Sequence, residues 1–141
     1  MRLGMGFIKK LKEMQELNDF KMVVEKTSTG FSAYSLDYPV FTTGKNMNEL
    51  LENSFEAANM YLEETGESLE KSRISFELNL EQFFKYYRVI NANYLADVIG
   101  MNPTLLSQYV SGKKKPSAQQ TKRIVEGINK IGRELSAIEL R

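Results

Sequence analysis

The stretch 92–111, ANYLADVIGMNPTLLSQYVS, constrains the fold more than any other part of the chain. Two helices that cross closely need a small residue at the crossing, and Ala96 occupies that position. Four residues later, Gly100 can adopt the positive φ that a tight turn between the helices requires. Asn102 followed by Pro103 is a strong helix start, because a capping side chain precedes the residue favoured at the first helical position. The spacing predicts a helix-turn-helix, held together by apolar side chains at Leu95, Ile99, Met101, Leu106 and Tyr109.

The second helix of this pair, expected over residues 103–111, has an outer face of short, neutral, hydrogen-bonding side chains. Such side chains can read base edges in the DNA major groove, and three lysines follow where they would meet phosphates. A helical hairpin with a merely solvated polar face is the alternative, but the packing residues, helix start, polar face and lysines together favour DNA binding. We expect bases to be read by Asn102, Thr104, Ser107, Gln108 and Ser111, and phosphates to be bound by Lys113, Lys114, Lys115, Lys122 and Arg123.

A third helix is expected after the lysines. Gly112 ends the second helix, and Pro116 and Ser117 start the next one, where Gln120 completes a capping box. The buried stripe of this third helix is predicted at Ile124, Ile128, Ile131 and Leu135.

A single recognition helix reads only a few base pairs, which is too little to specify a unique site. A homodimer or higher homo-oligomer on palindromic, double-stranded operator DNA is therefore expected. The tail after Gly132 is a candidate contact, because Leu135, Ile138 and Leu140 are apolar and residues 136–140 could pair as a strand across the dimer axis. The alternative is that the tail only completes the core of the last helix.

The first half of the chain follows a different period. From Phe20 onward, apolar residues alternate, which predicts three short strands. These strands are expected over residues 21–26, 31–37 and 39–44. Asn46 then resembles a helix N-cap for a helix to about Glu64, and strict alternation predicts a fourth strand at Ile74, Phe76, Leu78 and Leu80. The order β-β-β-α-β indicates a small, mostly antiparallel sheet covered by a helix, so the fold class is α+β, with this sheet domain followed by an all-α domain.

Two further segments have helical spacing. Residues 7–17 form an amphipathic pattern, and residues 81–90 are rich in aromatic side chains. Such aromatics could stack on bases, but Phe84, Tyr87 and Ile90 fall on one helical stripe, which favours core packing. The expected domains are an N-terminal extension, a sheet domain with its linker helix, and a helical domain, over residues 1–20, 21–90 and 91–141.

Charge divides along the same boundaries. Residues 21–90 hold seven basic and eleven acidic side chains, whereas residues 91–141 hold eight basic and four acidic ones. An acidic domain joined to a basic one suggests two different partners, although a solvated surface can segregate its charges in the same way.

The chain has no Cys and no His. It therefore lacks a thiolate nucleophile, cysteine ligands for zinc, and the commonest general base. Glu25 and Asp37 lie on neighbouring predicted strands, but two carboxylates without further ligands do not make a two-metal nuclease site. We expect a protein that is not an enzyme, with no catalytic residue, metal or cofactor. The lack of a long apolar run or a signal sequence predicts a cytoplasmic protein with no membrane partner.

Residues 91–135 closely resemble the Cro/repressor-like (XRE) helix-turn-helix. The family motif runs from leucine-serine through a short polar stretch to glycine, basic residues and proline-serine. Here these are Leu106-Ser107, Gly112, Lys113 to Lys115 and Pro116-Ser117. Val110 departs from the pattern, since the family often has an acidic residue at that position.

Residues 21–64 resemble the N-terminal domain of HicB-type antitoxins of type II toxin-antitoxin systems. The shared pattern consists of Gly30-Phe31-Ser32-Ala33-Tyr34, Asp37, Pro39, Thr43-Gly44 and Tyr61-Leu62. The resemblance implies a partial RNase H-like fold, a small mRNA-cleaving HicA-type toxin as partner, and autorepression of the shared operon.

Together, the two resemblances imply an antitoxin that neutralises its toxin through the first domain and represses transcription by binding operator DNA through the second. A stand-alone helix-turn-helix transcription regulator, whose first domain senses a small ligand, is the alternative. A small basic protein encoded beside this chain would favour the antitoxin.

Overall fold

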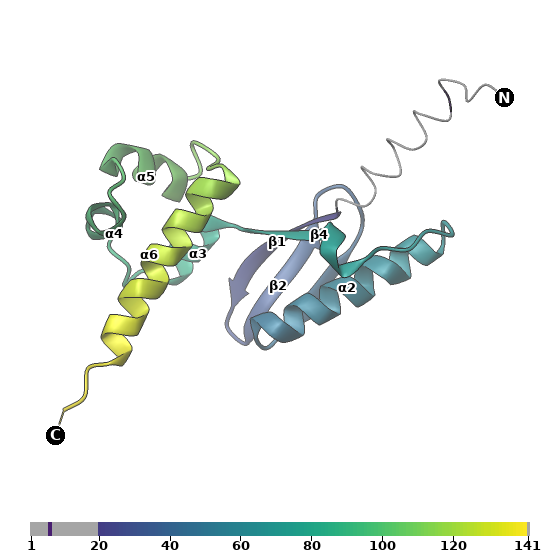
Figure 1. Cartoon of the computed structure of the whole chain (residues 1–141), viewed down its shortest axis with the longest axis horizontal. Coiled ribbons are helices and arrows are strands. Elements are labelled where there is room, and N and C mark those ends of the chain that lie inside the picture. The colour runs from purple at the N-terminus through teal and green to yellow at the C-terminus, as the bar shows by residue number, and fades with distance from the viewer. Residues whose placement is uncertain (1–5, 7–19, 141) are drawn as a thin grey trace. The chain divides into compact units, whose positions relative to one another are not determined.

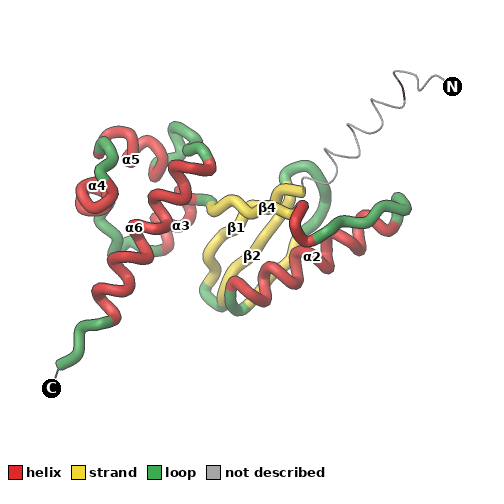
Figure 2. Tube along the Cα trace, in the orientation of Figure 1, coloured by secondary structure: helices red, strands yellow, loops and turns green. Residues whose placement is uncertain are grey.

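The chain forms two compact units, which divide between Leu78 and Asn79 (Figure 1). The computed structural model describes residue 6 and residues 20–140, so the helix expected over 7–17 lies outside the described residues. The fold is α+β, because the first unit contains a four-stranded mixed sheet and the second is helical (Figure 2).

The sheet contains β1 (Phe20–Thr27), β2 (Gly30–Ser35), β3 (Phe41–Gly44) and β4 (Ile74–Leu78) in the order β3-β2-β1-β4. The pairs β1–β2 and β2–β3 are antiparallel, whereas β4 lies parallel to β1. A parallel neighbour requires a crossover, which consists here of α2 (Met47–Glu63) and the 3₁₀ turn η1 (Lys71–Arg73). The predicted order β-β-β-α-β is confirmed.

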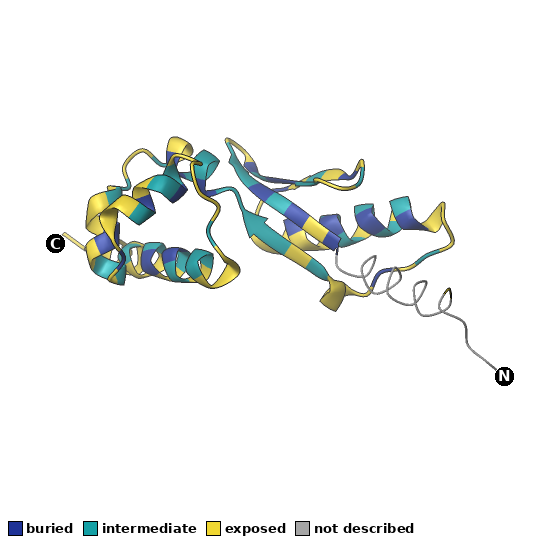
Figure 3. Ribbon diagram, turned by 90° about the horizontal axis from the view of Figure 1, so that it is seen from above, coloured by how far each residue is buried: buried dark blue, intermediate teal, exposed yellow. Residues whose placement is uncertain are grey.

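Helix α2 covers one face of the sheet, and its buried side contributes to the core. The helix starts where the sequence predicted, because the Asn46 Oδ1 accepts a hydrogen bond of 2.9 Å from the backbone N–H of Glu49. Its buried residues recur every four positions, as Leu50, Ser54, Ala58 and Leu62. They pack in one core cluster with buried strand residues, among them Phe20, Met22, Val24 and Ala33. Buried positions of the strands and of the helix are dark blue in Figure 3.

The second and third strands are shorter than predicted. β2 ends at Ser35 rather than at residue 37, and β3 begins at Phe41 rather than at residue 39. The Ser35 Oγ accepts hydrogen bonds from the N–H groups of Asp37 (3.2 Å) and Tyr38 (3.1 Å), which closes a turn between the strands. Short hydroxyl side chains compete with the sheet ladder in this way.

The fourth strand ends before Leu80, which the alternating pattern had assigned to it. Asn79 caps the helix α3 (Leu80–Tyr86) instead, since its Oδ1 accepts a hydrogen bond of 3.1 Å from the N–H of Gln82. This helix packs against α5 (Pro103–Val110) and buries Phe84. The boundary between the units therefore falls before α3 rather than after residue 90.

The second unit contains α3, α4 (Ala92–Ile99), α5 and α6 (Ala118–Ser136). Helix α4 packs against both α5 and α6. The core of this unit is formed by Leu80, Phe84, Leu95, Ala96, Met101, Leu106, Tyr109 and Ile124. Within residues 20–140, no helix has the length and apolar character needed to cross a membrane.

The buried stripe of α6 is shorter than predicted. Burial falls along the helix in the order Ile124 (fully buried), Ile128 and Ile131 (half-buried) and Leu135 (62% exposed). Gly127 is also buried, because α6 lies so close to α4 that a β-carbon at this position would overlap the side chain of Ile99. The last turns of α6 therefore extend beyond the core.

Candidate nucleic-acid interface

The connection between α4 and α5 is three residues long and has the local geometry that its sequence predicted. Gly100 has a φ of 67°, in the left-handed region that glycine favours. The N–H of Met101 donates a hydrogen bond of 2.9 Å to the carbonyl oxygen of Ala96, which is fully buried. The Asn102 Oδ1 then accepts a hydrogen bond of 2.8 Å from the N–H of Thr104 and starts α5. The local sequence thus decides where α5 begins and which of its side chains face outward.

One side of α5 is buried and the other is polar and accessible. Leu106 and Tyr109 are buried in the core of the second unit. The opposite side borders a shallow depression of about 330 Å³, lined by Asn93, Pro103, Thr104, Ser107, Gln108, Ser111 and Lys113. The structure therefore brings together four of the predicted base-reading residues and one predicted phosphate-binding lysine. Hydroxyl, amide and ammonium groups of this kind can match both base edges and phosphates.

Asn93 is the polar residue of this depression that the sequence did not assign to DNA binding; Pro103, the first residue of α5, is the apolar one. Asn93 is the second residue of α4, a helix capped by Asn91, whose Oδ1 accepts a hydrogen bond of 3.0 Å from the N–H of Tyr94. Its side chain is exposed. In the sequence, Asn93 belongs to the Asn-Ala-Asn start of α4. Such a start is typical of any capped helix, so it does not indicate a binding residue.

Asn102 and Ser111, both predicted to read bases, make hydrogen bonds within the helix. Asn102 caps α5 and does not line the depression. The Ser111 hydroxyl donates a hydrogen bond of 3.3 Å to the carbonyl oxygen of Gln108 in the last turn. Thr104, Ser107 and Gln108 are therefore the side chains best placed to meet a ligand.

The lysine loop, residues 112–115, follows α5 directly. Gly112 has a φ of 78° and ends the helix, as the sequence predicted. The N–H of Lys114 donates a hydrogen bond of 3.2 Å to the carbonyl oxygen of Gln108, which ties the loop to the helix. The Glu81 carboxylate of α3 occupies the space where a β-carbon of residue 112 would lie. All three lysines of the loop are exposed, and Lys113 lines the depression.

Lys122 and Arg123 differ in their surroundings, although both were predicted to bind phosphate. The Lys122 ammonium is exposed and lies 4.0 Å from the Glu126 carboxylate. The Arg123 guanidinium is half-buried and donates hydrogen bonds to the Ile99 carbonyl oxygen (2.8 Å) and to the Gln120 Oε1 (3.0 Å). Arg123 is thus engaged in joining α6 to the end of α4.

Formal charge favours an anionic ligand for the second unit. Residues 79–140 include nine basic and five acidic side chains, whereas residues 20–78 include five basic and ten acidic ones. A positive surface attracts phosphate backbones over distances limited by salt screening.

The face of the sheet opposite α2 is a second candidate surface. Tyr34 is paired with Phe41 on one side and with Val23 on the other, so these three side chains form a row on this face. Phe41 is 65% exposed, and the nearby Leu36 is 71% exposed. The Tyr34 hydroxyl donates a hydrogen bond of 3.2 Å to the Glu25 carboxylate, which places an acidic group beside the row.

Comparisons with known proteins give no further guide. No protein-family model, no curated protein and no solved structure matches this chain.

Among the residues that the structure describes, no group of three or more acidic side chains is arranged to hold a metal ion.

Proposed function

We propose that α4 and α5 form a helix-turn-helix, and that the second unit binds double-stranded operator DNA with α5 in the major groove. The proposal rests on one observation: a single depression is lined by Thr104, Ser107, Gln108 and Lys113. A recognition helix meets base edges with the residues of its first turns, and here Thr104 lies in the first turn. The lysines that follow α5 would then reach the phosphate backbone.

We further propose that the whole chain is a cytoplasmic antitoxin of the HicB type. In this proposal the first unit is a partial RNase H-like domain that binds and neutralises a small mRNA-cleaving HicA-type toxin, and the second unit represses the shared operon. Support comes from the family resemblance, the acidic charge of residues 20–78, and the exposed apolar side chains Phe41 and Leu36. Contiguous exposed apolar patches rimmed by polar residues are typical of protein interaction sites.

Selection of DNA from a random duplex library by the full-length protein tests the DNA-binding proposal. We expect enrichment of a palindrome whose half-sites are separated by one helical turn or a multiple of it. The same DNA sequence should occur in the promoter upstream of the gene that encodes this chain. Retention of all sequences alike, or of none, would contradict sequence-specific binding.

Co-expression with the neighbouring reading frame tests the antitoxin proposal. We expect the neighbour alone to arrest growth, and the pair to restore growth and to purify as one complex. Phe41→Asp should weaken the complex, whereas Met60→Asp, at an equally exposed apolar side chain on α2, should not. A harmless neighbour with no affinity for this chain would instead favour a stand-alone regulator.

A further inference from the structure

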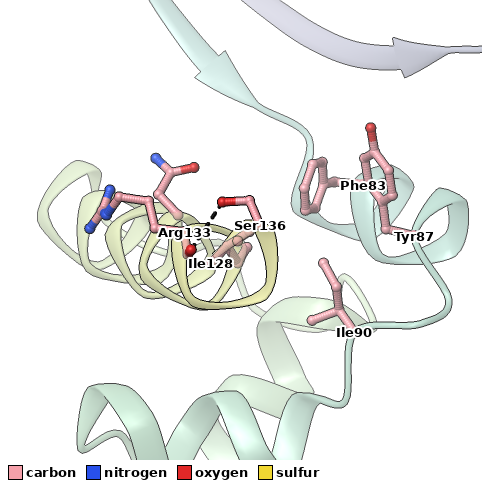
Figure 4. A pocket seen from close by; sticks show the side chains of 8 residues that line it. Phe83, Tyr87, Ile90, Ile128, Arg133 and Ser136 are labelled. Carbon is pink, nitrogen blue, oxygen red and sulfur yellow. Dashed lines mark hydrogen bonds between the residues drawn. The ribbon is translucent and has the colours of Figure 1, made fainter. Parts of the chain in front are cut away.

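A groove between α3 and α6 is a feature of the second unit that DNA binding leaves unexplained. It has a volume of about 470 Å³ and lies between the C-terminal half of α6 and the segment 83–90 (Figure 4). Phe83, Tyr87 and Ile90 form one wall, and Ile128 and Ser136 belong to the other. Most of the lining is apolar, so exposure of the groove to water is unfavourable.

Gly132 keeps this groove open. It lies within α6, where glycine is less favourable than alanine by about 1 kcal/mol. A β-carbon at Gly132 would meet no atom within 4 Å, so packing inside the chain does not require glycine at this position. At Gly127 of the same helix, close packing against α4 does require it. The space above Gly132 is therefore available to something outside the chain.

An apolar ridge lies beside the groove. Leu135 faces solvent in the last turn of α6, and the segment that follows the helix carries Ile138 and Leu140, which are 67% and 99% exposed. The ridge, defined as Leu135, Ile138 and Leu140, is continuous along the chain with Arg133 and Ser136 of the groove wall. One end of the unit thus presents an apolar hollow and an apolar projection side by side.

We propose that a second copy of this chain covers the groove, with the ridge of each copy inserted into the groove of the other. A two-fold interface is self-complementary, so it requires a projection and a matching hollow on the same surface. The charges of the ridge and the groove are also complementary. Arg133 lines the groove of one copy, and Glu139 lies between Ile138 and Leu140 in the ridge of the other. Large exposed apolar patches on one protein surface are typical of such interfaces.

This arrangement leaves the DNA-binding residues free. The groove involves α6 from Ile128 onward, whereas Lys122 lies near the start of that 19-residue helix. A helix rises about 1.5 Å per residue, so Lys122 lies about 9 Å from Ile128 along α6, and none of the residues that line the groove lines the depression beside α5. The use of the dimer rests on the proposed function, since each copy would read one half-site of the operator. The contact between the two copies does not depend on it.

The oligomeric state of the full chain tests the proposal. Analytical ultracentrifugation should show a dimer, and Ile138→Asp and Gly132→Trp should each weaken dimerisation about tenfold or more. A β-carbon at residue 132 meets no atom within 4 Å, so we expect the tryptophan of Gly132→Trp to enter the hollow, and far-ultraviolet circular dichroism should confirm that both variants stay folded. Met60→Asp, at a side chain of similar exposure in the first unit, is the matched control and should remain dimeric.

Mixing the two variants gives a sharper result. Ile138→Asp damages the projection and keeps the hollow, whereas Gly132→Trp blocks the hollow and keeps the projection. A mixed pair therefore retains one intact contact, while each variant paired with itself retains none. We expect heterodimers to form from two proteins that are separately monomeric. A general loss of folding would not give this complementation.

The outcomes separate this inference from the proposed function. A monomeric wild-type chain, or variants that dimerise as well as the wild type, would contradict the proposal that each ridge inserts into the groove of the other copy. DNA binding by such a chain would still support the helix-turn-helix. A dimer that is broken and complemented as described, but binds no DNA sequence, would support the exchange and contradict operator binding.

Discussion

The guanidinium of Arg123, near the start of α6, donates a hydrogen bond of 2.8 Å to the backbone carbonyl oxygen of Ile99, the last residue of α4. The final carbonyl groups of a helix have no partner within the helix, and a cation there also interacts favourably with the helix dipole. Arg123 therefore joins α6 to the point where the chain turns toward α5.

Arg123→Ala should lower the free energy of unfolding by about 1.5–3 kcal/mol, because a hydrogen bond from a charged group to a partly buried carbonyl is lost. Chemical denaturation at equilibrium measures this change. Lys122→Ala, at the exposed neighbour, is the control and should change stability by less than about 0.5 kcal/mol. If Arg123→Ala leaves stability unchanged and reduces only the salt dependence of DNA binding, Arg123 is a phosphate contact instead.

Gly127→Ala and Gly132→Ala should change stability in opposite directions, although both lie in α6. A methyl group at residue 127 overlaps the side chain of Ile99, so this variant should be destabilised by about 1–3 kcal/mol. A methyl group at residue 132 meets no atom within 4 Å, so the gain in helix propensity should stabilise that variant by about 0.5–1 kcal/mol. Thermal and denaturant unfolding compare the two, and equal effects would contradict the close approach of α6 to α4.

Gln108→Ala should weaken binding to the selected operator and relax base preference at one position in each half-site. The expected loss is about 1–3 kcal/mol where a bidentate contact to a base is removed. Fluorescence anisotropy with single-base variants of the site measures both effects. Gln119→Ala, at an exposed glutamine of α6, is the matched control. An unchanged base profile for Gln108→Ala would exclude this side chain from base reading.

Replacing Lys113, Lys114 and Lys115 with glutamine should weaken binding to all DNA sequences alike. Each lost phosphate contact reduces the slope of log affinity against log salt concentration by about 0.9. Affinities measured from low to physiological salt give this slope. Replacing the exposed Lys21, Lys45 and Lys130 removes the same charge and should leave the slope nearly unchanged. A loss confined to the operator sequence would contradict phosphate binding by the loop.

Features that depend on residues a few positions apart could be predicted without the structure. The caps at Asn46, Asn102 and Ser117 follow from one side chain bonding to backbone N–H groups two or three residues away, and all three are present. Gly100 takes its left-handed φ because other residues resist that conformation. Alternation of apolar residues likewise predicted the sheet, since one face of each strand must be buried.

Features that depend on contacts between residues far apart in the chain could not be predicted in this way. Arg123 has the sequence character of a surface cation, and only the approach of α6 to Ile99, 24 residues earlier, turns it into a helix cap. Leu80 fits a strand by alternation, but Asn79 ends that strand because its side chain caps α3. The periodicity of α6 continues to Leu135, yet burial stops earlier, since the neighbouring helices do not cover its last turns. Periodicity specifies which side of a helix is apolar, whereas the length of the surrounding elements decides how much of that side is covered.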